Sequence, residues 1–355
     1  MSILTRDCVC TFNRDACGEI SESSQRGKSE SEVLSALSGK IKASGVSPKI
    51  FQDQAMLDDL VFLPANLTRL LIDPYREECL TEAHIGMIGR TLRLDIPWVI
   101  GGLDFSGISD SEARAIALGA SKTGCAVRVP AAMAPHFTEC RTMVCLKPGE
   151  ELCGGNPEAI EISGVTADTG EQTWFSQTRN QNPSLPIGTL AEPGTAADAV
   201  EWAVRNELDF VTVMATSGTA NGVIAEDSLP EISTLAEAVE TARRLRAEEK
   251  LSIVYGGYIW CGADAARVMA LGASAVMLSS AVRTVLAAAS TDYPEEMAEY
   301  LTRFLVASTQ EISMLARVCG KTRTRNLEPE DMRSLTTVTS AATGIPLVGS
   351  DRIYR

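Results

Sequence analysis

The feature that most constrains the fold is a series of short apolar runs between residues 96 and 281, separated by spacers that include helix-like patterns. Apolar runs of this length are typical of strands that a parallel sheet buries on both faces. Parallel neighbours need a crossover connection, which a helix usually supplies. We predict eight strands, at 96–102, 125–130, 143–146, 159–164, 185–190, 209–214, 251–254 and 275–278. This series predicts a (β/α)8 TIM barrel, with a doubly wound open sheet as the alternative.

Helical patterns occupy several of the spacers and continue after the last strand. We expect helices at 109–122, 195–206, 234–250 and 293–318, and a short one at 31–43. Ser109 and Glu112 have the spacing of a capping box, which predicts the start of the first of these helices. Thr234 and Glu237 have the same spacing and predict the start of another.

The chain divides into three predicted parts. Residues 1–55 form a polar, Cys-bearing N-terminal tail, 56–290 the (β/α)8 barrel with a lead-in segment, and 291–355 a C-terminal helical extension. Hydrophobic residues make up 45% of the 355 residues, enough for a large buried core. We expect the two extensions to pack on the barrel or on a neighbouring subunit, which favours a homo- or hetero-oligomer.

Charge narrows the class of partner. The net charge of −14 argues against nucleic acid and against anionic membranes as partners, because both call for clustered Lys and Arg. No apolar run approaches the roughly 20 residues of a transmembrane helix. The first residues lack the apolar segment of a signal peptide. We therefore expect a cytoplasmic protein whose ligand is a small-molecule substrate or cofactor.

Ten cysteines include two groups that are close in sequence: Cys8, Cys10 and Cys17, and Cys140, Cys145 and Cys153. Three thiolates hold an iron–sulfur cluster when a further ligand joins them. Neither group contains a C-x-x-C pair, so we prefer unligated thiols and assign no metal ligand. With two histidines in the chain, His-based metal sites and Ser-His-Asp catalysis have little material.

The segment 251–281 carries the strongest indication of a ligand. A strand is followed by Gly256-Gly257, a helix with Asp264 near its start, a second strand and the turn Ser279-Ser280-Ala281. Glycine lets a backbone approach a ligand closely, and the loops after the last two strands of a barrel often bind a phosphate group through backbone N–H groups. The segment therefore predicts a phosphate site; the alternative is a βαβ unit that binds nothing.

Several stretches, taken in order, resemble one family. They are Asp58–Ala65, Ile72–Glu77, Ile96–Gly124, Gly256–Ala281 and Ala307–Leu347. Their order resembles the FMN-binding domain of glutamate synthase and the stand-alone glutamate-synthase-like flavoproteins, which include the large subunit of methylamine–glutamate N-methyltransferase. The resemblance implies a (β/α)8 barrel with FMN at its mouth and redox chemistry on an amino or keto acid, often with an iron–sulfur cluster as electron relay.

The same resemblance implies a set of cofactor-binding residues and leaves the catalytic residues unknown. The cofactor-binding set is Gly102, Asp104, Ser106, Ser217, Gly218, Gly256, Gly257, Gly262, Ser279 and Ser280. It combines the two phosphate turns, the segment after the first strand, and the turn after the sixth strand.

Departures from the family pattern leave the function open. Arg128–Met133 stands where the family has a glycine-rich turn, and Gly188 or Thr189 replaces the lysine of the fifth strand. A cation beside a flavin stabilises the negative charge of the reduced ring. Tyr258 and Trp260 follow the double glycine, and their side chains either fill the predicted phosphate site or pack away from it. A glutamate-synthase-like FMN subunit, a degenerate barrel that acts as scaffold or regulatory subunit, and a barrel for another phosphate-bearing ligand all remain possible.

Overall fold

Parallel strands close into a barrel. The computed structural model describes residues 55–65, 78–87, 89–152, 156–163, 171–215 and 232–350. Within them, hydrogen-bonded neighbours run in the closed order β10-β11-β4-β5-β6-β7-β8-β9. The strands are β4 (Trp98–Ile100), β5 (Ala126–Pro130), β6 (Arg141–Leu146), β7 (Ala159–Ile162), β8 (Ile187–Ala191), β9 (Phe210–Met214), β10 (Ser252–Gly256) and β11 (Ala275–Leu278). Each lies within or overlaps a predicted run, so the (β/α)8 barrel is confirmed and the open sheet is excluded.

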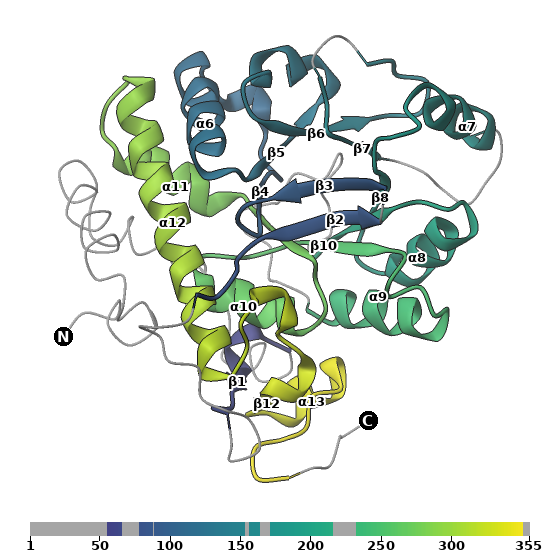
Figure 1. Ribbon diagram of the computed structural model, residues 1–355, viewed down its shortest axis with the longest axis vertical. Coiled ribbons are helices and arrows are strands. Elements are labelled where there is room, and N and C mark those ends of the chain that lie inside the picture. The colour runs from purple at the N-terminus through teal and green to yellow at the C-terminus, as the bar shows by residue number, and fades with distance from the viewer. Residues whose placement is uncertain are drawn as a thin grey trace, which may run out of the picture.

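Helices surround the barrel (Figure 1). They are α6 (Asp110–Thr123), α7 (Glu171–Gln181), α8 (Ala196–Arg205), α9 (Ser233–Arg244), α10 (Gly262–Ala270) and α11 (Ser280–Ala288). A 3-10 segment, η5 (Ala131–Phe137), replaces an α-helix between β5 and β6. The described parts of the β6–β7 connection, 147–152 and 156–158, contain no helix.

Of the two helix starts predicted from capping boxes, one is confirmed and the other is wrong. The capping box of α6 is confirmed, because Ser109 and Glu112 bond each other's backbone N–H groups. The predicted cap at Thr234 is wrong: α9 begins at Ser233, and Thr234 is buried inside its first turn. The helix also ends earlier than expected, at Arg244, because Arg246 has a φ of 55° and leaves the helical conformation. The predicted helix at 31–43 lies outside the described residues.

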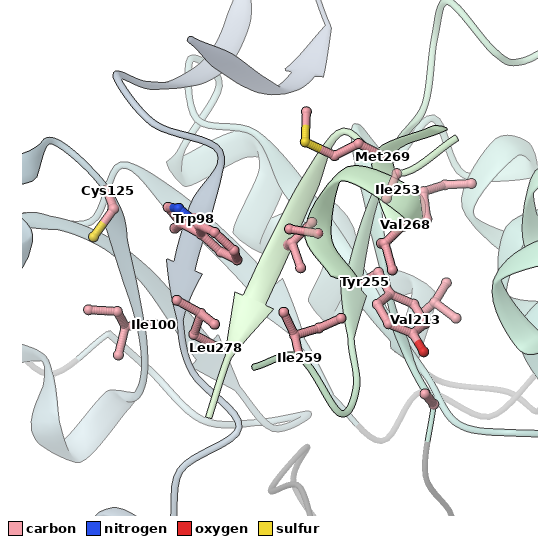
Figure 2. Packing of buried hydrophobic residues seen from close by; sticks show 14 of the residues in the cluster. Trp98, Ile100, Cys125, Val213, Ile253, Tyr255, Ile259, Val268, Met269 and Leu278 are labelled. Atoms are coloured by element: carbon pink, nitrogen blue, oxygen red, sulfur yellow. The ribbon is translucent and has the colours of Figure 1, made fainter. Parts of the chain in front are cut away.

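Each barrel strand buries both of its faces. Outward side chains such as Val127, Val129 and Tyr255 join the core between the strands and the helices. Figure 2 shows part of this outer core, with Trp98, Ile100, Tyr255 and Leu278 among its members. Inward side chains form a separate cluster in the barrel lumen, made up in part of Val99, Ala126, Met143, Ala159, Phe210, Met214, Val254, Ala275 and Met277. The alternation between these two cores fixes which residues of a strand face the lumen.

A β-hairpin closes the amino-terminal end of the barrel. It consists of β2 (Ala83–Met87) and β3 (Arg90–Leu94), which pair antiparallel. Its apolar side chains join the lumen cluster: Ala83, Ile85, Leu92 and Leu94. The N–H of Gly86 donates to Oγ of Ser252, the first residue of β10, at 3.0 Å. The hairpin therefore acts as a plug, which leaves the opposite end, where the strands end, as the place for a ligand site.

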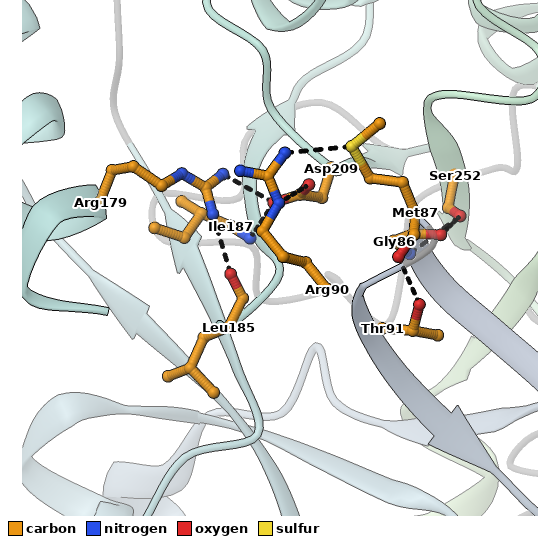
Figure 3. Close-up of polar contacts among 9 residues, drawn as sticks. All are labelled: Gly86, Met87, Arg90, Thr91, Arg179, Leu185, Ile187, Asp209 and Ser252. Atoms are coloured by element: carbon orange, nitrogen blue, oxygen red, sulfur yellow. Dashed lines mark hydrogen bonds and ion pairs between the residues drawn. The ribbon is translucent and has the colours of Figure 1, made fainter. Parts of the chain in front are cut away.

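A buried carboxylate, Asp209, joins the plug to the barrel wall (Figure 3). Its Oδ1 lies 3.0 Å from Nε of Arg90 on the hairpin. Its Oδ2 lies 2.6 Å from Nη2 of Arg179 on α7 and accepts the N–H of Ile187 at 2.8 Å. Nη1 of Arg179 also donates to Leu185 O, which fixes the start of β8. One carboxylate thus connects the plug, α7 and two barrel strands.

The lead-in segment and the C-terminal extension meet on the outside of the barrel. Strand β1 (Leu60–Phe62) pairs antiparallel with β12 (Met332–Ser334). Asp59 accepts hydroxyl hydrogen bonds from Thr336 and from Thr339 of α13 (Thr337–Thr343). The long helix α12 (Pro294–Val318) lies along α6, where Leu301 covers Gly119. Short 3-10 turns η3 (Leu57–Asp59), η4 (Phe105–Gly107), η6 (Thr324–Asn326) and η7 (Pro329–Asp331) complete the described elements.

The predicted boundary at residue 55 falls at the edge of the described residues, and the tail itself lies outside them. Among the helices that the structure describes, none is both long and apolar enough to cross a membrane.

We expect the substitution Asp209→Asn to lower the free energy of unfolding by about 3–5 kcal/mol, because it leaves two partly buried arginines without their counter-charge. The matched control is Glu201→Gln, which removes an exposed ion pair with Arg244 and should cost less than about 1 kcal/mol. Urea denaturation followed by circular dichroism measures both. Equal losses for the two variants would contradict the role of Asp209 as the anchor of the plug.

Candidate functional site

The two predicted phosphate turns lie side by side at the open end of the barrel. Gly256, the last residue of β10, is in register with Met277 of β11, so the turns after these strands start together. Ser279 is buried and Ser280 is the first residue of α11. Backbone N–H groups at the start of a helix carry a partial positive charge that attracts anions. The structure therefore places Gly257, Ser279 and Ser280 around the start of a nine-residue helix.

The turn after β4 belongs to the same edge. The N–H of Gly101 donates to Leu278 O at 2.9 Å, and Gly102 has a φ of 68°, which favours glycine. Asp104 accepts hydrogen bonds from the N–H and the hydroxyl of Ser106. These bonds, together with the charge of Arg283 on α11, lower the pKa of the exposed Asp104 carboxyl. Gly102, Asp104 and Ser106 thus lie at the mouth with Ser279 and Ser280.

Protein side chains occupy the space beside two predicted cofactor glycines. A Cβ atom at Gly256 would lie 2.7 Å from Sδ of Met214 and 3.4 Å from Sδ of Met277. A Cβ atom at Gly257 would lie 2.6 Å from the ring of Tyr255. Gly256 is therefore required by packing beneath the mouth, and Gly257 by packing against the outward ring of Tyr255, whether or not a ligand is bound.

Gly262, the first residue of α10, packs against α12. A Cβ atom there would lie 2.1 Å from Ser308 O and 2.7 Å from Cβ of Glu311, both on α12. Its lack of a side chain allows α10 and α12 to approach closely, and its role toward a cofactor stays a prediction. The other two members of the predicted set, Ser217 and Gly218, lie outside the described residues.

Tyr258 and Trp260 pack against each other, with ring centroids 5.4 Å apart and an edge-to-face angle of 62°. The N–H of Trp260 donates to Oδ2 of Asp264 on α10 at 3.1 Å. Arg267, also on α10, forms ion pairs with Asp264 and with Asp58 of the lead-in segment. This loop is therefore held by α10 and the lead-in segment. The side chains that fill the space beside the glycines come from other positions. The indole Nε1 of Trp260 is buried without a hydrogen-bond partner in the described part of the chain.

A polar cluster in the lumen was missed at the sequence level. Arg128 of β5 and Glu161 of β7 are 5% and 0% exposed and form an ion pair. Nε of Arg128 donates to Oε1 of Glu161 at 2.9 Å, and Nη2 bonds the same oxygen. Sγ of Cys145 on β6 lies 3.6 Å from this oxygen as well. The signal was present in the sequence, since each charge interrupts an apolar strand run, where a charge needs a partner.

The neighbours of this cluster place it near the carboxyl ends of the strands. A Cβ atom at Gly101 would lie 2.8 Å from Cβ of Arg128 and 3.1 Å from Sδ of Met277. The cluster therefore lies in the same layer as the methionines beneath the glycine turns. At the predicted lysine position on β8, Gly188 is covered by the ring of Phe210, and Thr189 faces outward and bonds Ile162 O.

The second cysteine group does not converge in the described residues. Cys145 faces the lumen, whereas Cys140 packs against the outer core. Burial raises the pKa of the Cys140 thiol to about 12. No set of three His, Cys, Asp or Glu side chains suited to a metal occurs among the residues that the structure describes. Cys153 and the three tail cysteines lie outside them.

Comparison with known proteins agrees with this fold and with the resemblance. The family model for the conserved region in glutamate synthase matches residues 172–291. A glutamate synthase large subunit-like protein of Rhizobium meliloti (strain 1021) is 23% identical over 406 residues, covering 87% of this chain and 90% of the relative.

Solved structures with the same fold include a mandelate oxidase mutant with (S)-mandelic acid, at a TM-score of 0.58 and 16% identity, covering 89% of this chain and 98% of that one. A flavocytochrome b2 variant with sulfite bound gives a TM-score of 0.55 at 14% identity, covering 85% and 82% of the two chains. These similarities concern the fold alone.

The fold and the mouth define a (β/α)8 barrel with its ligand end opposite a plugged base. Within that class, the chain is similar to the conserved region of glutamate synthase over residues 172–291 and to a glutamate synthase large subunit-like protein over most of its length.

We expect Gly262→Ala to lower the free energy of unfolding by about 1–3 kcal/mol, because the new methyl group collides with the backbone of α12. The matched control is Gly107→Ala, where nothing lies within 4 Å of the added atom and the change should stay within about 0.5 kcal/mol. Thermal unfolding measures both variants without added ligand. Unchanged stability of Gly262→Ala would remove the packing explanation for this glycine.

Proposed function

We propose that the protein is a flavoprotein that binds FMN at the barrel mouth and carries out redox chemistry on an amino or keto acid. The observation that carries the proposal is the pair of adjacent turns at Gly257 and Ser279-Ser280, which meet at the start of α11. Backbone donors at a helix start suit the phosphate group of FMN. The family match covers both turns. The buried indole N–H of Trp260 is a further donor without a protein partner in this loop.

Bound FMN would supply the transfer of electrons to or from the substrate. The protein's own contribution is to hold and to orient. Ser279 and Ser280 offer N–H groups to the phosphate, and Gly102 lets the turn after β4 come close to α11. Met214 and Met277 belong to the apolar cluster of the lumen and lie beneath the turn at Gly256.

A second candidate function is a scaffold or regulatory subunit whose barrel has lost catalysis. One observation favours it: the lysine position on β8 holds Gly188, which Phe210 covers, while the lumen cation Arg128 is neutralised by Glu161. A reduced flavin gains a negative charge that a nearby cation stabilises. A neutralised mouth offers less of this support than the family pattern does.

The visible absorbance spectrum of the purified full-length protein tests the first proposal. We expect the bands of oxidised flavin, either as isolated or after incubation with FMN and removal of the excess. A protein that shows no flavin bands under both conditions would favour the scaffold.

We expect Ser280→Asp to weaken FMN binding by at least about tenfold, because a carboxylate at the first position of α11 repels the phosphate. The same change should raise helix stability by about 0.3–1 kcal/mol, because it complements the helix dipole. The matched control is Thr337→Asp, which adds the same charge at the first position of α13. Fluorescence titration with FMN measures the affinities. Equal affinities for the two variants would place the phosphate elsewhere.

A further inference from the structure

The buried cluster of Arg128, Cys145 and Glu161 has a feature that the proposed flavin site leaves unexplained. The Glu161 side chain is fully buried, and its two carboxylate oxygens have different surroundings. Oε1 accepts two bonds from Arg128 and contacts Sγ of Cys145 at 3.6 Å. Oε2 is buried and has no hydrogen-bond partner within the described part of the chain.

This arrangement fixes the orientation of the carboxylate. Arg128 lies on β5, Cys145 on β6 and Glu161 on β7, so three neighbouring strands hold the group from one side. An unsatisfied buried acceptor is costly, and native proteins rarely leave one without a partner. Oε2 is therefore an acceptor held in place for a donor that the described residues do not supply.

Charge decides which kind of donor fits. Arg128 already balances the charge of Glu161. Burial raises the pKa of the Cys145 thiol well above its ordinary value; Glu161 adds to this shift although Arg128 opposes it, so the thiol stays neutral. An ammonium ion on Oε2 would leave a net positive charge in the lumen, which is costly in a dry site. A neutral N–H group leaves the charges balanced.

The lumen offers a second polar atom of the same kind. Thr212 of β9 is fully buried, and its Oγ1 has no hydrogen-bond partner in the described residues. Its neighbours Val211 and Val213 join the outer core, so the hydroxyl faces the lumen. Two buried polar atoms without partners are unfavourable in a lumen that is only packed, whereas a ligand site uses such atoms to orient the ligand.

We propose that Glu161, held by Arg128, accepts through Oε2 a hydrogen bond from the neutral N–H of an amide or imide group on a ligand at the barrel mouth. Two sources share this chemistry: the imide of the flavin ring, in which case the inference rests on the proposed function, and the side-chain amide of a substrate such as glutamine. Glu161 is thus a binding residue near the carboxyl ends of β5–β7, in the same layer as Met277.

The experiment uses calorimetric titration of the full-length protein with two ligand pairs. FMN is compared with N3-methyl-FMN, which lacks the imide N–H, and glutamine is compared with glutamate, which lacks the amide. We expect the wild-type protein to prefer the N–H-bearing member of one pair by at least tenfold. A preference within the first pair identifies the flavin, and one within the second pair identifies a substrate amide.

In the variant Glu161→Gln, Arg128 holds the amide oxygen and the NH2 group takes the place of Oε2, so the preference should fall to less than threefold. Because this variant leaves Arg128 without a counter-charge, the double variant Arg128→Met with Glu161→Met, which has no acceptor, is measured beside it, and thermal unfolding reports whether each folds. Glu112→Gln, at the exposed capping box of α6, is the control and should keep the full preference.

The wild-type comparison needs no variant, so the inference stays testable if both substitutions prevent folding. Equal affinities within both ligand pairs would overturn it and would leave Oε2 to a water molecule. If neither FMN nor its methylated form binds, the flavin proposal fails separately, and the glutamine pair alone then decides for or against Glu161. A preference that survives in a folded Glu161→Gln protein would also overturn it.

Discussion

The structure depends on a volume constraint: every barrel strand is buried on both faces, and the lumen is too narrow for large side chains at all positions. Large and small residues therefore alternate around it. Phe210 fills the space beside Gly188, the two methionines fill the space beside Gly256, and Arg128 lies against Gly101. A glycine in this barrel is accordingly first a packing residue, and only its backbone groups at the mouth are available to a ligand.

The barrel contains two buried carboxylates, and they differ in how their two oxygens are paired. Asp209, at the base, has Arg90 on one oxygen and Arg179 on the other. That pairing suits a permanent anchor. Glu161, at the mouth, has its contacts with Arg128 and Cys145 on one oxygen. Each oxygen of Asp209 thus has a cation beside it, although Oδ1 makes no hydrogen bond within the described residues. Oε2 of Glu161 has no hydrogen-bond partner there, and it lies toward the end at which such barrels bind ligands.

Local sequence determined what could be predicted. Strands buried on both faces leave long apolar runs, and a capping box occupies four consecutive residues, so the barrel and the start of α6 were predictable. Contacts between distant residues were not: Gly262 meets α12 through Ser308, and Arg128 meets Glu161 across 33 positions. The charges inside β5 and β7 indicated buried pairs, but the register that joins them is a property of the closed sheet.

The segment that matches the family model and the strands that carry the buried charges form different parts of the mouth. Residues 172–291 run from α7 to just beyond α11 and include the turns suited to a phosphate. The cluster around Glu161 lies on β5, β6 and β7, before that segment. Similarity therefore supports the part of the site that would anchor a cofactor, whereas these three strands present side chains that the family pattern did not predict. If FMN binds as proposed, anchoring its phosphate would not determine what lies beside its ring, and we expect ligand specificity to depend on the charges of β5–β7.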